Sequence, residues 1–225
     1  MLGAACAVEP RRAPIEPEGR IEILGPEIGF STRVLPADWL IDGQSPPSER
    51  LNVVIKDSVP ALRIVGGESE FVLARRTDTP LLVSPYLSWS RRVEPPAGAV
   101  HPVGLVVGFS GGDRTPPSRG AQRRGWFGPT LPPHDRQLSI GWGEASTERD
   151  LLDPADAGAR NRRYVQRMGP EALDSWRLEA VDLVALYARA WPGDDTARVR
   201  IAFVGIAVTS ERPGTAYLSG ILLSR

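Results

Sequence analysis

The sequence predicts an all-β fold, an antiparallel two-sheet β-sandwich of jelly-roll type with one short helix. Apolar residues alternate with other residues over short segments, which indicates strands with one buried face. Loops rich in proline and glycine separate these segments, as is typical of sandwiches and barrels. The alternation is clearest at residues 80–93, 103–110, 138–144 and 199–209.

The composition fits one large soluble domain. The chain has 225 residues, of which 41% are hydrophobic and 24% charged,. It contains 27 basic and 27 acidic residues, so the net charge of zero argues against a nucleic-acid partner,. With one cysteine and two histidines, we expect no disulfide, no metal site and no cofactor,.

The N-terminal residues predict a flexible tether at 1–19, ahead of a sandwich domain at 20–225. Cys6 follows Leu2-Gly3-Ala4-Ala5, and small residues before a cysteine are typical of a bacterial lipoprotein signal,. The charged and hydrophobic parts of such a signal are absent, so Cys6 is either a lipid anchor or incidental. No stretch reaches the length of a membrane span, so we expect membrane contact only through Cys6.

The first half of the chain contributes further elements. These are a short strand at 19–24, a turn with the anchor Trp39 at 36–39, strands at 51–55 and 61–65, and a strand beginning at 71–74.

The second half contains the least regular segments. Residues 111–136 are rich in Gly, Pro and Arg without any period, which predicts a mobile insertion between two strands,. Residues 146–163 read as a second polar loop, and 216–223 as the final strand. The spacing of apolar residues over 170–191 favours, taken alone, a single amphipathic helix.

Five segments together resemble a bacterial family catalogued only as domain of unknown function 3047. They are LPADW at 35–39, TPLLVSPYLSWSRRV at 79–93, LSIGWG at 138–143, WRLEAVDL at 176–183, and residues 204–222. The resemblance covers residues 30–223 and implies a secreted or periplasmic protein without an established activity. It also implies a strand at 175–180 and a helix only at 182–189, which we adopt over the single helix.

No residue has the context of a catalytic group. His101 and His134 lie beside prolines in loops, without a recognisable nucleophile motif,. Glycoside hydrolysis needs two carboxylates across a cleft. We interpret the carboxylates near strand ends as solvated charges; they are Glu70, Glu94, Glu144 and Glu179.

Several strands carry large residues on one face and small ones on the other. We expect the large face to form a common core of Trp89, Leu105, Val107, Phe109, Ile140, Trp142 and Phe203. Glycine inside a strand often marks the close approach of a ligand. The small faces therefore predict a shallow groove of Ser88, Ser90, Gly104, Gly108, Ser139, Gly141 and Gly143, with Tyr86, Arg92 and Glu144 at its margins. Alternatively, the N-terminal strand, the helix or the 111–136 loop covers this face.

These features favour a non-catalytic binding module, secreted or anchored in the periplasm or cell envelope. The expected partner is a saccharide or a similar polar polymer. The candidate ligand-binding residues are Tyr86, Ser88, Arg92, Trp126 and Glu144. Two alternatives stay open: a polysaccharide hydrolase using loop carboxylates such as Glu144, and an envelope assembly or structural protein whose Arg-rich loop meets an acidic surface.

Overall fold

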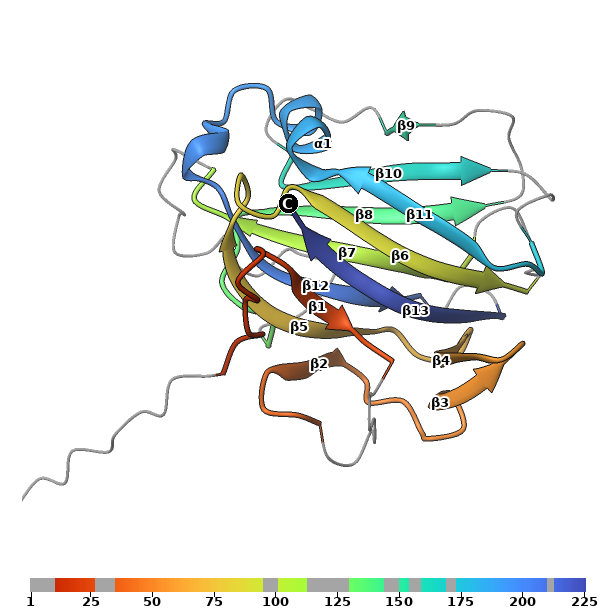
Figure 1. The fold of residues 1–225 in the computed structure, drawn as a ribbon. Coiled ribbons are helices and arrows are strands. Elements are labelled where there is room, and N and C mark those ends of the chain that lie inside the picture. The colour runs from red at the N-terminus through yellow and green to blue at the C-terminus, as the bar shows by residue number, and fades with distance from the viewer. Residues whose placement is uncertain are drawn as a thin grey trace, which may run out of the picture.

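Two β-sheets packed face to face form the protein (Figure 1). The computed structural model describes residues 11–26, 35–94, 101–112, 130–143, 150–153, 159–168, 173–209 and 213–225. Cys6, Trp126, Glu144 and most of the predicted mobile insertion lie outside these ranges.

The six-stranded sheet is entirely antiparallel, in the order β11-β6-β13-β4-β3 with β1 paired to β13. A two-residue turn joins β3 to β4, and both of its residues, Asp57 and Ser58, have positive φ, as tight hairpins require,. The strands are β1 (Ile21–Leu24), β3 (Leu51–Lys56), β4 (Val59–Gly66), β6 (Tyr86–Val93), β11 (Arg177–Asp182) and β13 (Gly214–Ser224).

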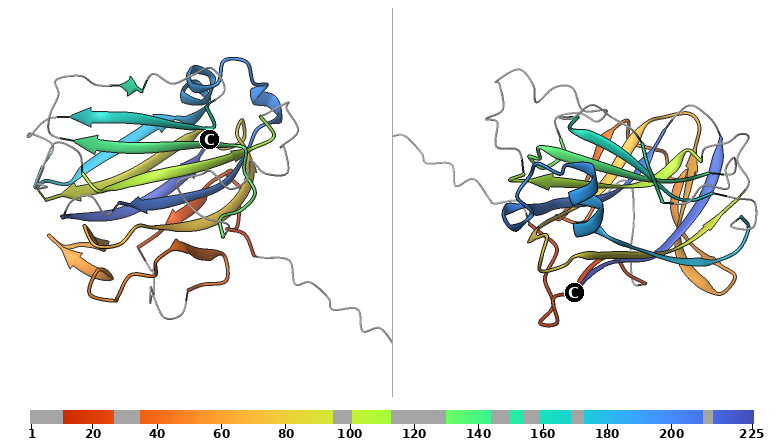
Figure 2. Two further views of the ribbon diagram at one scale, coloured as in Figure 1. Left: turned by 180° about the vertical axis from the view of Figure 1, so that it is seen from behind. Right: turned by 90° about the horizontal axis from the view of Figure 1, so that it is seen from above.

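The seven-stranded sheet has the order β2-β5-β12-β7-β8-β10-β9, and its β8–β10 pair is parallel. Figure 2 shows the two layers and the position of α1 (Leu183–Ala190) at one edge. The strands are β2 (Trp39–Gly43), β5 (Phe71–Pro80), β7 (Val103–Ser110), β8 (Arg136–Gly143), β9 (Leu151–Leu152), β10 (Asn161–Met168) and β12 (Arg200–Val208). The predicted two-sheet sandwich with one short helix is confirmed.

The core lies between the sheets and contains all but one of the residues predicted for it. The exception is Phe203, which is buried on the opposite, outer face of the seven-stranded sheet. A β-bulge between Ile201 and Phe203 interrupts the pairing of β12 with both neighbours. Because a bulge adds one residue, strict alternation assigns Phe203 to the wrong face.

Two strand predictions need correction. Residues 80–93 are not one strand, because β5 ends at Pro80 and the chain turns before β6 begins at Tyr86. In this turn Val83 N–H donates to the Pro80 carbonyl at 3.0 Å. The segment 146–163 was predicted as a polar loop, yet β9 (Leu151–Leu152) lies within it and β10 begins in it at Asn161. Its sequence NRRYVQRM has no apolar alternation that indicates a strand.

The boundary between β11 and α1 agrees with the resemblance rather than with local periodicity. Asp182 ends β11 and caps the helix, and its side chain accepts a hydrogen bond from Ala185 N–H at 2.9 Å. Capping of this kind satisfies one of the unpaired amides of a first helical turn. All six residues of β11, from Arg177 to Asp182, pair with β6, so these residues belong to the sheet and the helix begins only after them.

Candidate functional site

The outer face of the seven-stranded sheet contains a hollow of about 390 Å³. It lies over β7, β8 and β10, which are neighbours in the sheet (Figure 2, left). Its lining comprises His101, Pro102, Val103, Gly104, Leu105, Gln137, Ser139, Ile140, Gly141, Asn161, Arg162, Arg163, Ala207 and Thr209.

Small residues form the floor of the hollow. Gly104 of β7 pairs with Ala207 of β12, and Ser139 and Gly141 lie on the neighbouring β8. A Cβ on Gly104 would lie 2.7 Å from the Ile140 carbonyl oxygen, so this position needs glycine. A Cβ on Gly141 would touch only the Arg163 side chain, at 3.9 Å. The backbone therefore does not require glycine at position 141, and the Arg163 side chain lies above it at contact distance.

Polar side chains surround this floor. Gln137 and Asn161 pair with each other across β8 and β10, and Ser139 pairs with Arg163 in the same way. Arg162 is also in the lining, and its guanidinium donates to the Asp153 carbonyl of the neighbouring segment at 2.9 Å. In the lining given above, which covers described residues only, there is no Asp or Glu.

His101 lines one end of the hollow but is itself buried. Its Nδ1 accepts a hydrogen bond from Val103 N–H at 3.1 Å, and its ring lies 6.2 Å from that of Trp142. Burial lowers the pKa of His101 to about 4. The imidazole is therefore neutral at neutral pH and adds no charge to the hollow.

A second apolar cluster lies on this outer face over β2, β5, β7 and β12. Leu131 is buried there, and the His134 ring meets that of Phe203 edge-on at 5.2 Å. A Cβ on Gly108 would lie only 2.0 Å from Phe203, so Gly108 is beneath this cluster rather than in the hollow. Phe203 of β12 therefore covers Gly108, and His134 from the described end of the 111–136 segment packs against Phe203.

The predicted groove combined residues that belong to different sheets, and this composition is wrong. Ser88 and Ser90 lie on β6 in the six-stranded sheet, whereas Gly104 and Gly141 lie in the other sheet. Leu87, Trp89 and Val93 of β6 face the core, so the residues between them point to the opposite outer surface.

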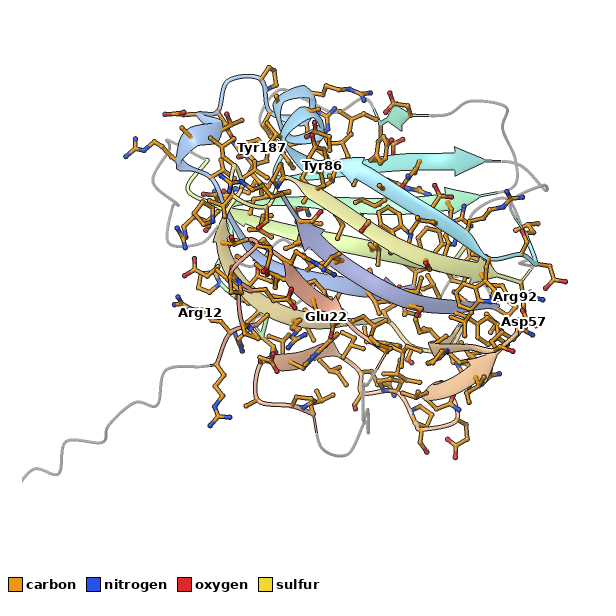
Figure 3. The ribbon with its side chains drawn as sticks, in the orientation of Figure 1. Arg12, Glu22, Asp57, Tyr86, Arg92 and Tyr187 are labelled. Atoms are coloured by element: carbon orange, nitrogen blue, oxygen red, sulfur yellow. The ribbon has the colours of Figure 1, made fainter. Side chains whose placement is uncertain are left out.

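The two candidate residues at the ends of β6 are also on that opposite surface (Figure 3). Tyr86 is 46% exposed. Arg92 donates to Asp57 at 2.5 Å and to Asp174 at 2.7 Å, so its charge is already matched. Ser88 is half-buried between them. The described part of the chain does not bring Tyr86, Ser88 or Arg92 to the hollow.

Glu179 is not the solvated charge that its sequence position predicted. It is only 8% exposed, and it accepts from Arg91 and from Gln166, each at 3.1 Å. Arg91 faces the core, with its guanidinium 5.2 Å from the centre of the Trp142 ring. Since Gln166 lies on β10 and Glu179 on β11, this polar cluster ties the two sheets together at one edge. No sequence pattern distinguishes such an inward-facing pair from surface charges.

Two features are absent from the described ranges. No three His, Cys, Asp or Glu side chains in these ranges come together as metal ligands would. Within the same ranges, no helix has both the length and the apolar character needed to cross a bilayer.

Comparisons with known proteins show similarity only to solved structures. No family model matches the chain, and no curated protein is similar to it in sequence. The endo-1,4-β-glucanase CelB2 is 11% identical, with 96% of this chain and 100% of that chain covered at a TM-score of 0.45.

Two further structures are similar at the same level. The family 30 carbohydrate-binding module of a Clostridium thermocellum cellulase is 12% identical, with coverage of 80% and 85% and a TM-score of 0.39. The xyloglucanase domain of NopAA from Sinorhizobium fredii, in complex with cellobiose, is 10% identical, with coverage of 78% and 91% and a TM-score of 0.41. At such identities and TM-scores, these proteins assign no function to this chain.

Proposed function

We propose that this protein is a non-catalytic binding module whose hollow takes part of a saccharide or a similar polar polymer. The observation that carries this proposal is the floor of Gly104, Ser139 and Gly141, above which the described chain leaves about 390 Å³ open. This volume is within the range of small-molecule sites, which is about 300–1,000 Å³.

The polar groups around the floor suit a ligand rich in hydroxyls. Sugar hydroxyls both donate and accept hydrogen bonds, as do the side chains of Gln137, Ser139, Asn161 and Thr209,. Glycines also bring backbone groups close to a ligand. A shallow site of this kind binds weakly, with a dissociation constant on the order of 10–1000 μM.

A glycan array probed with the labelled full chain tests the proposal. We expect binding to at least one class of oligosaccharide, followed by loss of affinity of at least about tenfold in Gly141→Leu, because leucine fills the hollow. Gly193→Leu is the matched control, since a Cβ on Gly193 meets nothing within 4 Å. Absence of binding across the array would overturn the proposal, as would full binding by Gly141→Leu. Turnover of the bound oligosaccharide would replace it with the hydrolase alternative.

We also propose that the module acts in the periplasm or cell envelope, with Cys6 as its lipid anchor. The support is the small residues before Cys6 and the resemblance to a secreted or periplasmic family. Cys6→Ser should move the protein from the membrane fraction of its host to the soluble fraction. A protein that is soluble with Cys6 intact would rule out the anchor.

A further inference from the structure

The described lining of the hollow carries a positive charge, although the chain as a whole has no net charge. Arg162 and Arg163 border it, and the described lining holds no Asp or Glu. His101, with its pKa lowered to about 4 by burial, does not change this balance at neutral pH. The proposed saccharide site therefore has an electrostatic preference.

Arg163 is the cation most available to a ligand. Its side chain lies over the bare backbone of Gly141 and is half-buried. Its guanidinium makes no hydrogen bond or ion pair with any residue that the structure describes. Other arginines differ in this respect, since a carboxylate binds the guanidinium of each of Arg75, Arg92, Arg136, Arg189 and Arg200.

A partly desolvated guanidinium that the described residues leave unpaired has a defined chemical complement. Its planar fork of N–H donors matches two oxygens of a carboxylate or sulfate. Partial burial strengthens this attraction relative to a fully solvated arginine.

We infer that the hollow selects saccharides that carry an oxyanion, either the carboxylate of a uronic acid or a sulfate ester. The Arg163 guanidinium binds the oxyanion above Gly141, and the sugar ring lies beside it against the floor at Gly104 and Ser139. This inference rests on the proposed function and specifies its ligand class.

The experiment compares matched ligands with two arginine variants. The array carries neutral, uronate-containing and sulfated oligosaccharides, and members that bind are then titrated calorimetrically against neutral oligosaccharides of the same length and linkage. The variants are Arg163→Gln and Arg198→Gln. Arg198 is an exposed arginine just before β12 begins, whereas the hollow lies near the end of that strand. Its substitution therefore removes one positive charge at a distance from the hollow. Melting temperatures of both variants verify the fold.

We expect the acidic ligand to bind at least about tenfold more tightly than its neutral match, whether the oxyanion is carboxylate or sulfate. Arg163→Gln should abolish this preference, and Arg198→Gln should preserve it. Added salt should weaken binding of the acidic ligand only. Equal binding of neutral ligands, or an unchanged preference in Arg163→Gln, would overturn the inference while leaving the proposed function intact. Absence of binding by every ligand would overturn the proposed function itself.

Discussion

The two outer faces of the sandwich carry arginines in opposite circumstances. On the six-stranded sheet, Arg92 lies between two carboxylates, one from the β3–β4 turn and one from the segment before β11. On the seven-stranded sheet, Arg163 lies over Gly141 beside an open hollow, with no such partner in the described chain. Small residues lie near an arginine on both outer faces, but only on the seven-stranded sheet does this arrangement border a candidate site. The difference comes from Asp57 and Asp174, which are distant from Arg92 in the sequence but bind its guanidinium in the fold.

We expect the largest difference in stability between substitutions in the core and substitutions on the outer face of the six-stranded sheet. Phe109→Ala or Trp142→Ala should lower the free energy of unfolding by about 3–5 kcal/mol, because each removes a buried aromatic ring,. Tyr86→Ala should lower it by less than about 1 kcal/mol, since that ring is largely exposed,. Urea unfolding measures all three variants. A small loss at Phe109 or Trp142 would mean that the faces have been assigned the wrong way round.

Acid should destabilise the protein through His101. The folded pKa is lowered to about 4 by burial from its ordinary value of 6.5, with a smaller lowering from Arg91. The unfolded chain therefore binds more protons between these values, and stability is lost as pH falls from 6.5 towards 4. The loss from this group reaches about 2–3 kcal/mol.

His101→Gln provides the control for this pH dependence. Urea unfolding between pH 7 and 4 should show a shallower decline in the variant, because glutamine does not titrate. Parallel declines in the two proteins would show that His101 is protonated as easily in the folded chain as in the unfolded one.

Two glycines of the hollow should respond differently to the same substitution. Gly104→Ala should lower stability by about 1–3 kcal/mol, because its Cβ would press on the Ile140 carbonyl of the adjacent strand,. Gly141→Ala should change it by less than about 0.5 kcal/mol, since its Cβ meets only a side chain at normal contact distance,. Thermal unfolding distinguishes the two. An equal loss at both positions would mean that Gly141 is needed by the sheet rather than leaving room for a ligand.

The β-sandwich could be predicted because the alternation of apolar residues within a strand indicates which of its faces is buried, without knowledge of the rest of the chain. Leu105, Phe109, Ile140 and Trp142 were assigned to the core from their own strands alone, and the structure confirms all four. Phe203 was assigned to the wrong face because the bulge beside it shifts the alternation by one residue, and the neighbouring residues do not indicate where the bulge lies.

The candidate site could be predicted only in part, because alternation does not reveal which sheet a strand joins. Gly104, Ser139 and Gly141 do share a face and line the hollow. Ser88 and Ser90 show the same pattern but belong to the other sheet. Arg163 was missed because β10 shows no apolar alternation and pairs in parallel with β8, a contact that depends on the path of the whole chain. The sequence NRRYVQRM itself contains no signal that places Arg163 over Gly141.

Amide chemical shifts in a titration of the ¹⁵N-labelled full chain test most directly which outer face binds the ligand. The probe is the tightest acidic oligosaccharide from the array. Shifts should concentrate at Gly104, Ser139, Gly141 and Arg163 and leave Ser88, Ser90 and Arg92 unchanged, and Arg163→Gln should weaken the fitted affinity by at least about tenfold, or about 1.4 kcal/mol. Shifts concentrated on β6, with the hollow unaffected, would contradict the assignment of the site to the seven-stranded sheet.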